Sequence, residues 1–129
     1  MKAKLVLLIA SGIVMVALPA RAHHSFAAEF DVNQPITLQG TLTKMEWVNP
    51  HGWLHIDVKG PDGKVTNWAI EASTPNQLYR AGWRKDDVKI GDTVTLTDTS
   101  PARNGSAKAA GGTLTLASGR KVFSGSAEQ

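Results

Sequence analysis

The residues of this sequence best suited to chemistry are its four histidines, which fall in two short segments. His23 and His24 are adjacent, and His51 and His55 lie four residues apart. If the chain were cut after Ala22, His23 would present a free α-amine next to its own ring Nδ1, and these two nitrogens could chelate one ion. A second imidazole would complete a three-nitrogen site. His51 suits this role better than His24, because adjacent residues seldom bind one ion without straining the backbone.

Such a nitrogen set in a tetragonal arrangement favours Cu(II), with Ni(II) and Zn(II) behind it. We therefore predict a metal site from His23, His24 and His51, with Cu(II) as the expected ion and no other cofactor. Three more side chains could add a weak ligand or a hydrogen bond to a ligand. They are Glu46, His55 and Glu71. In the alternative interpretation the histidines are incidental: the terminal pair binds nothing, and the other two only cap a turn or fill a strand face.

A secretion signal would supply the free amine that this site needs. The chain has lysines at positions 2 and 4, continues with an apolar stretch over residues 5–18, and reaches Ala-Arg-Ala at residues 20–22. This succession is typical of a signal peptide, and the apolar stretch is too short for a comfortable membrane span. We predict a signal peptide over residues 1–22 and a single domain over residues 23–129. The product would be periplasmic or secreted, with no membrane attachment after cleavage.

The charge of the full chain gives a false indication of its partners. The 129 residues carry 14 Lys and Arg against 11 Asp and Glu, a formal charge of +3. Three of the basic residues and none of the acidic ones lie in residues 1–22, so the remainder carries 11 of each. A net charge of zero argues against nucleic acid or an anionic lipid surface as a partner. The absence of cysteine excludes disulfides and thiolate metal sites.

Strands are expected to position these side chains. Five segments alternate apolar and polar residues as half-buried strands do. They are residues 36–43, 53–59, 65–71, 93–97 and a last strand or hairpin over 113–123. Ser73 or Thr74 can cap a short helix over residues 75–81, Pro75 suits its first turn, and Gly82 is placed to end it. Residues 99–112, rich in Gly, Ala and Ser, are predicted to be a loop.

The order of three strands, a helix and two strands is that of an OB-type barrel. We predict an all-β fold, a small OB-like five-stranded antiparallel barrel with one short helix between strands 3 and 4. Gly40 is expected at a bend of the first strand. The four tryptophans are expected mainly in the core rather than on a stacking platform. One shared core should contain Leu54, Ile56, Val58, Trp68 and Ile70.

Several motifs also carry a resemblance to a known family. They are HHSF at residues 23–26, FD at 30–31, EWVNPH at 46–51, WAIE at 68–71 and GRKVF at 119–123. On these motifs the chain resembles a group of small exported bacterial proteins, known as domain of unknown function 6152. The resemblance implies an exported, barrel-like, single-domain protein, and it implies no reaction.

The sequence favours a binding module over an enzyme. It has no Gly-x-Ser-x-Gly elbow and no Gly-rich phosphate loop before a helix, and so small a domain leaves little room for a substrate site. We expect a non-enzymatic exported module that binds copper or a related divalent ion. The alternative is a module that binds a small ligand or a periplasmic protein through the barrel face and residues 99–112, with the histidines incidental.

Overall fold

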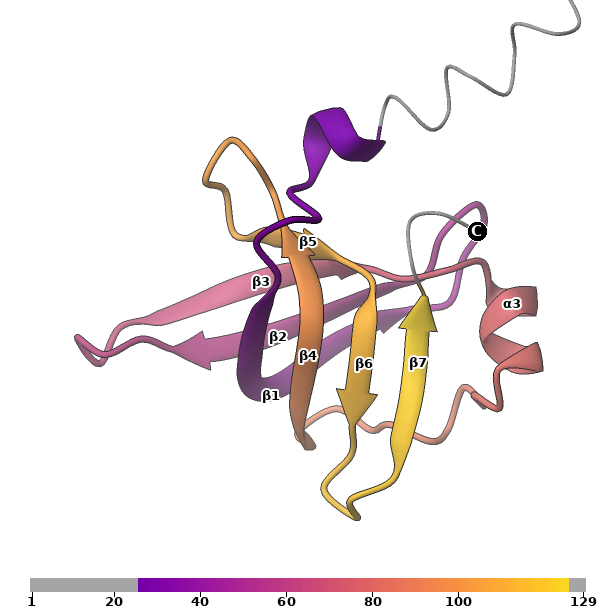
Figure 1. The fold of residues 1–129 in the computed structure, drawn as a ribbon. Coiled ribbons are helices and arrows are strands. Elements are labelled where there is room, and N and C mark those ends of the chain that lie inside the picture. Colours follow the sequence, from indigo (N-terminus) through magenta and orange to yellow (C-terminus); the bar gives the residue numbers. More distant parts are fainter. Residues whose placement is uncertain (1–25, 126–129) are drawn as a thin grey trace, which may run out of the picture.

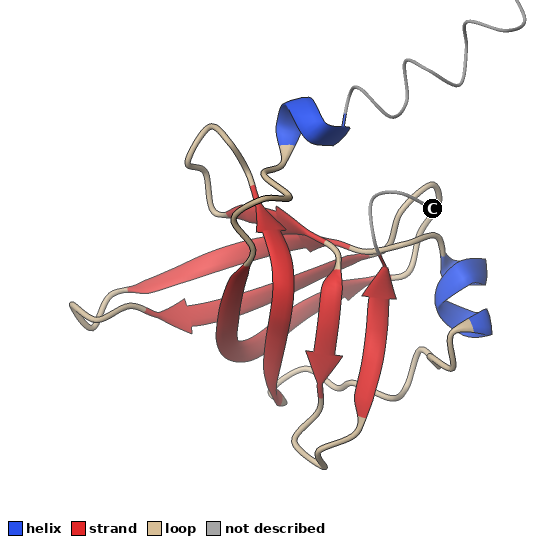
Figure 2. Cartoon of the chain, viewed as in Figure 1, coloured by secondary structure: helices blue, strands red, loops and turns tan. Residues whose placement is uncertain are grey.

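The structure, a computed structural model, describes residues 26–125 of the chain. A helical turn at residues 26–29 precedes seven strands and a second short helix. Figure 2 shows how strands dominate the molecule. The elements are β1 (Ile36–Glu46), β2 (Trp53–Lys59), β3 (Val65–Glu71), α3 (Pro75–Arg80), β4 (Thr93–Pro101), β5 (Lys108–Ala110), β6 (Gly112–Thr115) and β7 (Lys121–Gly125). None of the helices in this part of the chain is long and apolar enough to cross a membrane.

Five of the strands close into a barrel (Figure 1). β1 pairs antiparallel with both β2 and β4, and β2 pairs antiparallel with β3. β5 completes the ring by pairing parallel with β3 and antiparallel with β4. The prediction of an OB-like five-stranded barrel with a helix between strands 3 and 4 is thereby confirmed, and one of its pairings is parallel.

The strand that closes the barrel comes from the segment predicted to be a loop. β4 continues to Pro101, and β5 occupies residues 108–110, so much of the interval 99–112 is strand. Its alanines fit because Ala109 points into the interior and is fully buried. The hairpin predicted near the C-terminus is also present. It forms β6 and β7, which continue the sheet from β4 beyond the barrel.

β1 bends so that it can pair with two neighbours. Its first half, Ile36 to Thr41, pairs with β4, and its second half, Thr41 to Glu46, pairs with β2. Gly40 lies near the change of partner, and a Cβ there would be 2.3 Å from the backbone oxygen of Asp57. Only glycine permits so close an approach, which confirms the predicted bend at Gly40.

The helix α3 begins and ends at residues that the sequence marks. The Thr74 hydroxyl accepts a hydrogen bond from the Gln77 backbone N–H, and the Gln77 side chain accepts one from the Thr74 N–H, each at 3.3 Å. This capping box satisfies two donors at the helix start. Gly82 follows the helix with a φ of +97°, a left-handed conformation that favours glycine. Leu78 is buried and attaches α3 to the core.

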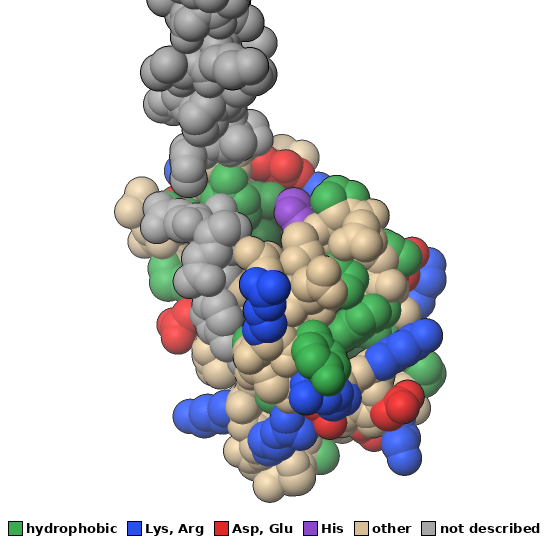
Figure 3. Space-filling view, turned by 90° about the vertical axis from the view of Figure 1, so that its right-hand side faces the viewer, with side chains coloured by type: hydrophobic (Ala, Val, Ile, Leu, Met, Phe, Trp, Pro, Cys, Tyr) green, Lys and Arg blue, Asp and Glu red, His purple; other side chains and the backbone are tan. Residues whose placement is uncertain are grey.

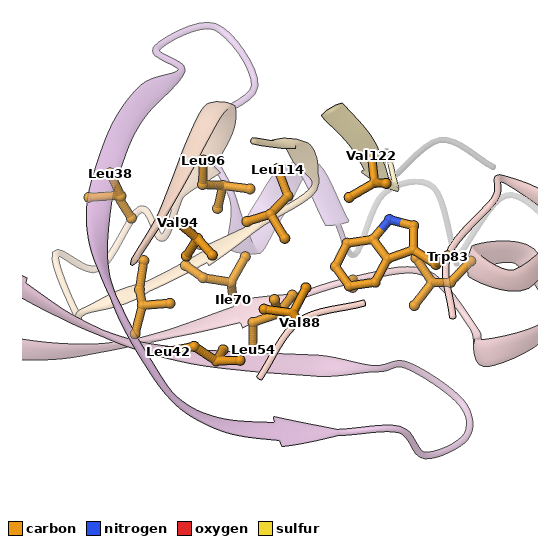
Figure 4. Packing of buried hydrophobic residues seen from close by; sticks show 14 residues of the cluster. Leu38, Leu42, Leu54, Ile70, Trp83, Val88, Val94, Leu96, Leu114 and Val122 are labelled. Atoms are coloured by element: carbon orange, nitrogen blue, oxygen red, sulfur yellow. The ribbon is translucent and has the colours of Figure 1, made fainter. Parts of the chain in front are cut away.

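The interior of the barrel is filled by aliphatic side chains that point toward one another (Figure 4). Leu54, Ile56 and Ile70 are almost fully buried there, and Val58 and Trp68 pack against the same cluster. The predicted shared core is therefore confirmed. Trp83 lies at one end of it and is 1% exposed, and Trp47 packs at 6.2 Å from its ring. Trp53 is the tryptophan that turns to the outer face.

Candidate metal site

The predicted site residues that the structure describes lie on one outer face of the barrel. Glu46 of β1 is opposite Trp53 of β2, which is opposite Glu71 of β3. Directly opposed residues in adjacent strands point to the same side of a sheet, and this row alternates with the buried one. The next outward row contains Lys44, His55, Ala69 and Lys108. His51 lies just before β2, in the loop that joins it to β1.

His51 is held by Glu71. Its Nδ1 contacts the Oε1 of Glu71. The carboxylate side chain is 17% exposed, whereas the imidazole is 48% exposed. A carboxylate that accepts from Nδ1–H selects the tautomer whose lone pair is on Nε2. The half-exposed ring is therefore oriented with Nε2 left for a ligand. Figure 3 shows a histidine side chain at the surface, with hydrophobic side chains beside it.

His55 forms a second imidazole–carboxylate pair. Its Nε2 lies 2.8 Å from Oε2 of Glu46, whose other oxygen accepts a hydrogen bond from Lys44 at 2.9 Å. These hydrogen bonds, first from Lys44 and then from His55, hold the pKa of Glu46 below its ordinary value. Glu46 therefore remains a carboxylate at neutral pH. His55 contacts it through Nε2, whereas His51 contacts Glu71 through Nδ1.

The N-terminal arm, defined here as residues 26–31, reaches the same part of the barrel. Phe26 and Phe30 stack with their ring centroids 4.8 Å apart. Phe30 is 1% exposed and forms a small cluster with Ala102 and Ala110, against which Phe26 packs. Ala110 is the register partner of Glu71. The arm thus lies one strand away from the residue that holds His51.

Two of the predicted ligands, His23 and His24, lie outside the described residues, as does the predicted signal peptide of residues 1–22. Within residues 26–125, no group of three or more His, Asp or Glu side chains comes together as a metal site. The described part of the chain provides two separate pairs, His51 with Glu71 and His55 with Glu46. The predicted metal site would also need His23 or His24, from the segment before Phe26.

Sequence reasoning did not find the cations of this face. Lys108 binds Glu29 of the arm, and its Nζ lies 5.3 Å from the ring centre of Trp53 and 5.5 Å from that of Phe30. Arg103 binds the arm as well. Both belong to the segment predicted to be a loop, where no periodicity indicated which side chains would face the site.

Fold and site together define a small OB-like barrel protein with an oriented imidazole on its outer face. A family model matches residues 10–112, and its description is a family of unknown function, DUF6152. The chain belongs to this family, which confirms the predicted resemblance to it. None of the curated proteins and none of the solved structures compared with the chain matches it. Membership of the family assigns no activity, so function must be argued from the site.

Proposed function

We propose that this protein is an exported, non-enzymatic module that binds one divalent ion, Cu(II) in preference to Ni(II) or Zn(II). The ligands are the α-amine and ring of His23, available once residues 1–22 are removed, and the ring of His51. His24 is the alternative source of an imidazole. The module works in the periplasm or outside the cell, where the absence of cysteine from the sequence leaves nitrogen ligands as its way to hold copper.

The contact between His51 and Glu71 carries the proposal. A metal-binding histidine almost always donates its other ring N–H to a carboxylate, a carbonyl or water. Here Nδ1 contacts a largely buried carboxylate and the ring is nearly half exposed. Glu71 is therefore assigned to the outer shell, as the residue that orients His51.

The proposed ligand set limits how far the arm can lie from His51. Phe26 packs against a cluster that includes Ala110, and Ala110 is paired with Glu71. Adjacent strands lie about 4.8 Å apart. The three residues from His23 to Phe26 can span at most about 10 Å. The proposal therefore requires the ring of His51 to lie within reach of that short segment.

Glu46 and His55 have no place among the proposed ligands. Glu46 and His55 are hydrogen-bonded to each other, and Lys44 also donates a hydrogen bond to Glu46. An ion there would have to displace an ammonium that already neutralises the carboxylate. This difference supplies a control, because His55→Ala removes an imidazole from the same face without touching the proposed site.

Three forms of the protein test the proposal: one that begins at His23, one that retains Ala22, and His51→Ala in the form that begins at His23. The first should bind one Cu(II) most tightly, because a free amine with a pKa of about 8 can lose its proton and coordinate, whereas a peptide nitrogen is a poor ligand. Calorimetry gives the affinities, and electron paramagnetic resonance reports the nitrogen ligands.

The intact mass of protein from a periplasmic extract shows whether the mature chain begins at His23. Another first residue would end the proposal, because the amine would then belong to that residue. Equal copper affinity for the three forms would also end it. In that case the histidines are an incidental chelating tail, and the interaction-module alternative takes its place.

A further inference from the structure

The connection between β4 and β5 contains the one Asn-Gly dipeptide of the sequence, Asn104-Gly105. Both residues are exposed, as are Arg103 before them and Ser106 after them. A Cβ built on Gly105 would meet no atom beyond its chain neighbours within 4 Å. The backbone nitrogen of Gly105 is therefore approachable, and no side chain of its own shields it.

This dipeptide places an electrophile next to a nucleophile. The side-chain amide carbon of an asparagine and the backbone nitrogen of the next residue close a small ring when they join, and a side chain on that next residue hinders the attack. Glycine has none. The Oδ1 of Asn104 accepts a hydrogen bond from the Ser106 N–H at 3.0 Å, which draws electron density from the amide carbon. The Gly105 N–H donates to the carbonyl of Ala102 at 3.2 Å. This bond has to open before the ring closes, but its net contribution is modest.

The other four asparagines of the sequence lack this combination. Each is followed by a residue that carries a side chain: Gln34, Pro50, Trp68 and Gln77. Asn67 is also held in β3, where its amide donates to Asp57 at 2.8 Å and to Thr43 at 3.0 Å. These asparagines therefore serve as internal references for Asn104.

The same connection binds the N-terminal arm. The Arg103 N–H donates to the carbonyl of Glu29 at 2.9 Å, and its Nε donates to that of Ala27 at 2.7 Å. Lys108, at the other end of the connection, forms an ion pair with Glu29. The length of the main chain over residues 104–107 therefore determines how far apart these two cations lie.

We propose that Asn104 is a site of spontaneous covalent modification, and that the isoaspartate it forms releases the arm. The Gly105 nitrogen bonds to the Cγ of Asn104 and loses its proton, the Cγ–Nδ2 bond breaks, and ammonia leaves. One water then opens the ring at either of its two carbonyls. Opening at the Cγ carbonyl gives aspartate. Opening at the backbone carbonyl gives isoaspartate, whose main chain runs through Cβ and Cγ and is one methylene longer. This inference goes beyond the proposed function and does not depend on metal binding.

The extra methylene lies between Arg103 and Lys108, which contact the arm from the two ends of the connection. The turn between them is closed by hydrogen bonds that depend on the ordinary chain length. Isoaspartate in place of Asn104 therefore moves one cation relative to the other, and the arm cannot keep both contacts. Aspartate adds the same negative charge but leaves the main chain as it was, so the arm should stay docked.

The test ages the purified protein in mildly alkaline buffer and follows each asparagine by peptide mapping with mass spectrometry. Asn104 should convert to aspartate and isoaspartate, while the other four asparagines stay intact over the same period. A synthetic peptide of residues 101–108 gives the rate without the folded turn. Asn104→Ser is the matched control, because serine keeps an oxygen that can accept from the Ser106 N–H but has no amide to lose.

Amide hydrogen exchange reports whether the arm stays docked. Over residues 27–31 it should accelerate in aged wild-type protein. It should stay slow in aged Asn104→Ser and in freshly prepared Asn104→Asp, which carries the charge without the longer main chain. An Asn104 that stays intact while the peptide converts would overturn the proposal. Conversion with unchanged exchange would overturn the release of the arm, and equal acceleration in Asn104→Asp would overturn the role of the longer main chain.

Discussion

Replacing Glu71 tests whether a carboxylate orients His51. Glu71→Gln keeps the shape and an oxygen that can accept from Nδ1–H, so the favoured tautomer is retained while the charge is lost. Glu71→Ala removes both the charge and the accepting oxygen. Glu71 is only 17% exposed, so solvent weakly screens the interaction between its carboxylate and the His51 ring. We therefore expect Glu71→Ala to weaken Cu(II) binding near the upper end of the tenfold to hundredfold range for such partners, and Glu71→Gln near the lower end.

In free energy this range is about 1.4–2.8 kcal/mol, at 1.4 kcal/mol for each factor of ten. Calorimetry on the form that begins at His23 measures it, and the copper resonance spectrum shows whether the His51 nitrogen remains bound. Glu46→Ala is the matched control, because it removes the other paired carboxylate of the same face. Copper affinity that falls for His51→Ala but not for Glu71→Ala would refute the orienting role. A similar fall for Glu46→Ala and Glu71→Ala would show a general effect of charge.

Two further predictions concern the barrel itself. Gly40→Ala places a Cβ 2.3 Å from the Asp57 carbonyl oxygen. It should lower the free energy of unfolding by about 1–3 kcal/mol, as overpacking does. Urea unfolding measures this change, and Thr41→Ala at an exposed position is the control. The backbone N–H of Arg84, followed by Arg120, lowers the pKa of Asp87. The ionised Asp87 contributes stability above the ordinary carboxyl pKa of about 3.9, and this contribution is lost as pH falls through the lowered pKa. Asp87→Asn should therefore make the free energy of unfolding depend less on pH below about pH 4. An unchanged pH dependence would contradict it.

Strand bounds were predictable where the alternation runs without interruption. β1 and β4 extend to Glu46 and Pro101, beyond their predicted ends at 43 and 97, because β1 has a register shift after Leu42 and β4 has a positive φ at Asp98. β2 and β3 alternate over seven residues each, and their predicted bounds agree with the structure. β5 has three residues, which is too short for alternation to be recognised, and alanine has little preference for strands. Its strand conformation results from the space between β3 and β4, a tertiary effect that local sequence does not contain.

The sequence pointed to the residues of the candidate site singly, but it did not show which of them pair. His51 and Glu71 were both singled out, but they are twenty positions apart in the sequence. Their contact depends on the register that sets Trp53 against Glu71. A shift of one residue would turn Glu71 to the other face of the sheet. Arg103 and Lys108 were missed because their contacts depend on where the arm docks.

The contacts of Arg103 and Lys108 with the arm also determine when the arm can dock during folding. Arg103 and Ala27 are 76 positions apart, and Lys108 and Glu29 are 79 apart, so these are among the contacts of longest sequence separation in the described chain. Contacts of such separation form slowly, since most of the chain must be brought together first. His51 and Glu71 can meet as soon as β2 and β3 pair. The arm can therefore dock only after residues 101–108 are in place, so it is expected to be among the last parts of the described chain to reach its final position.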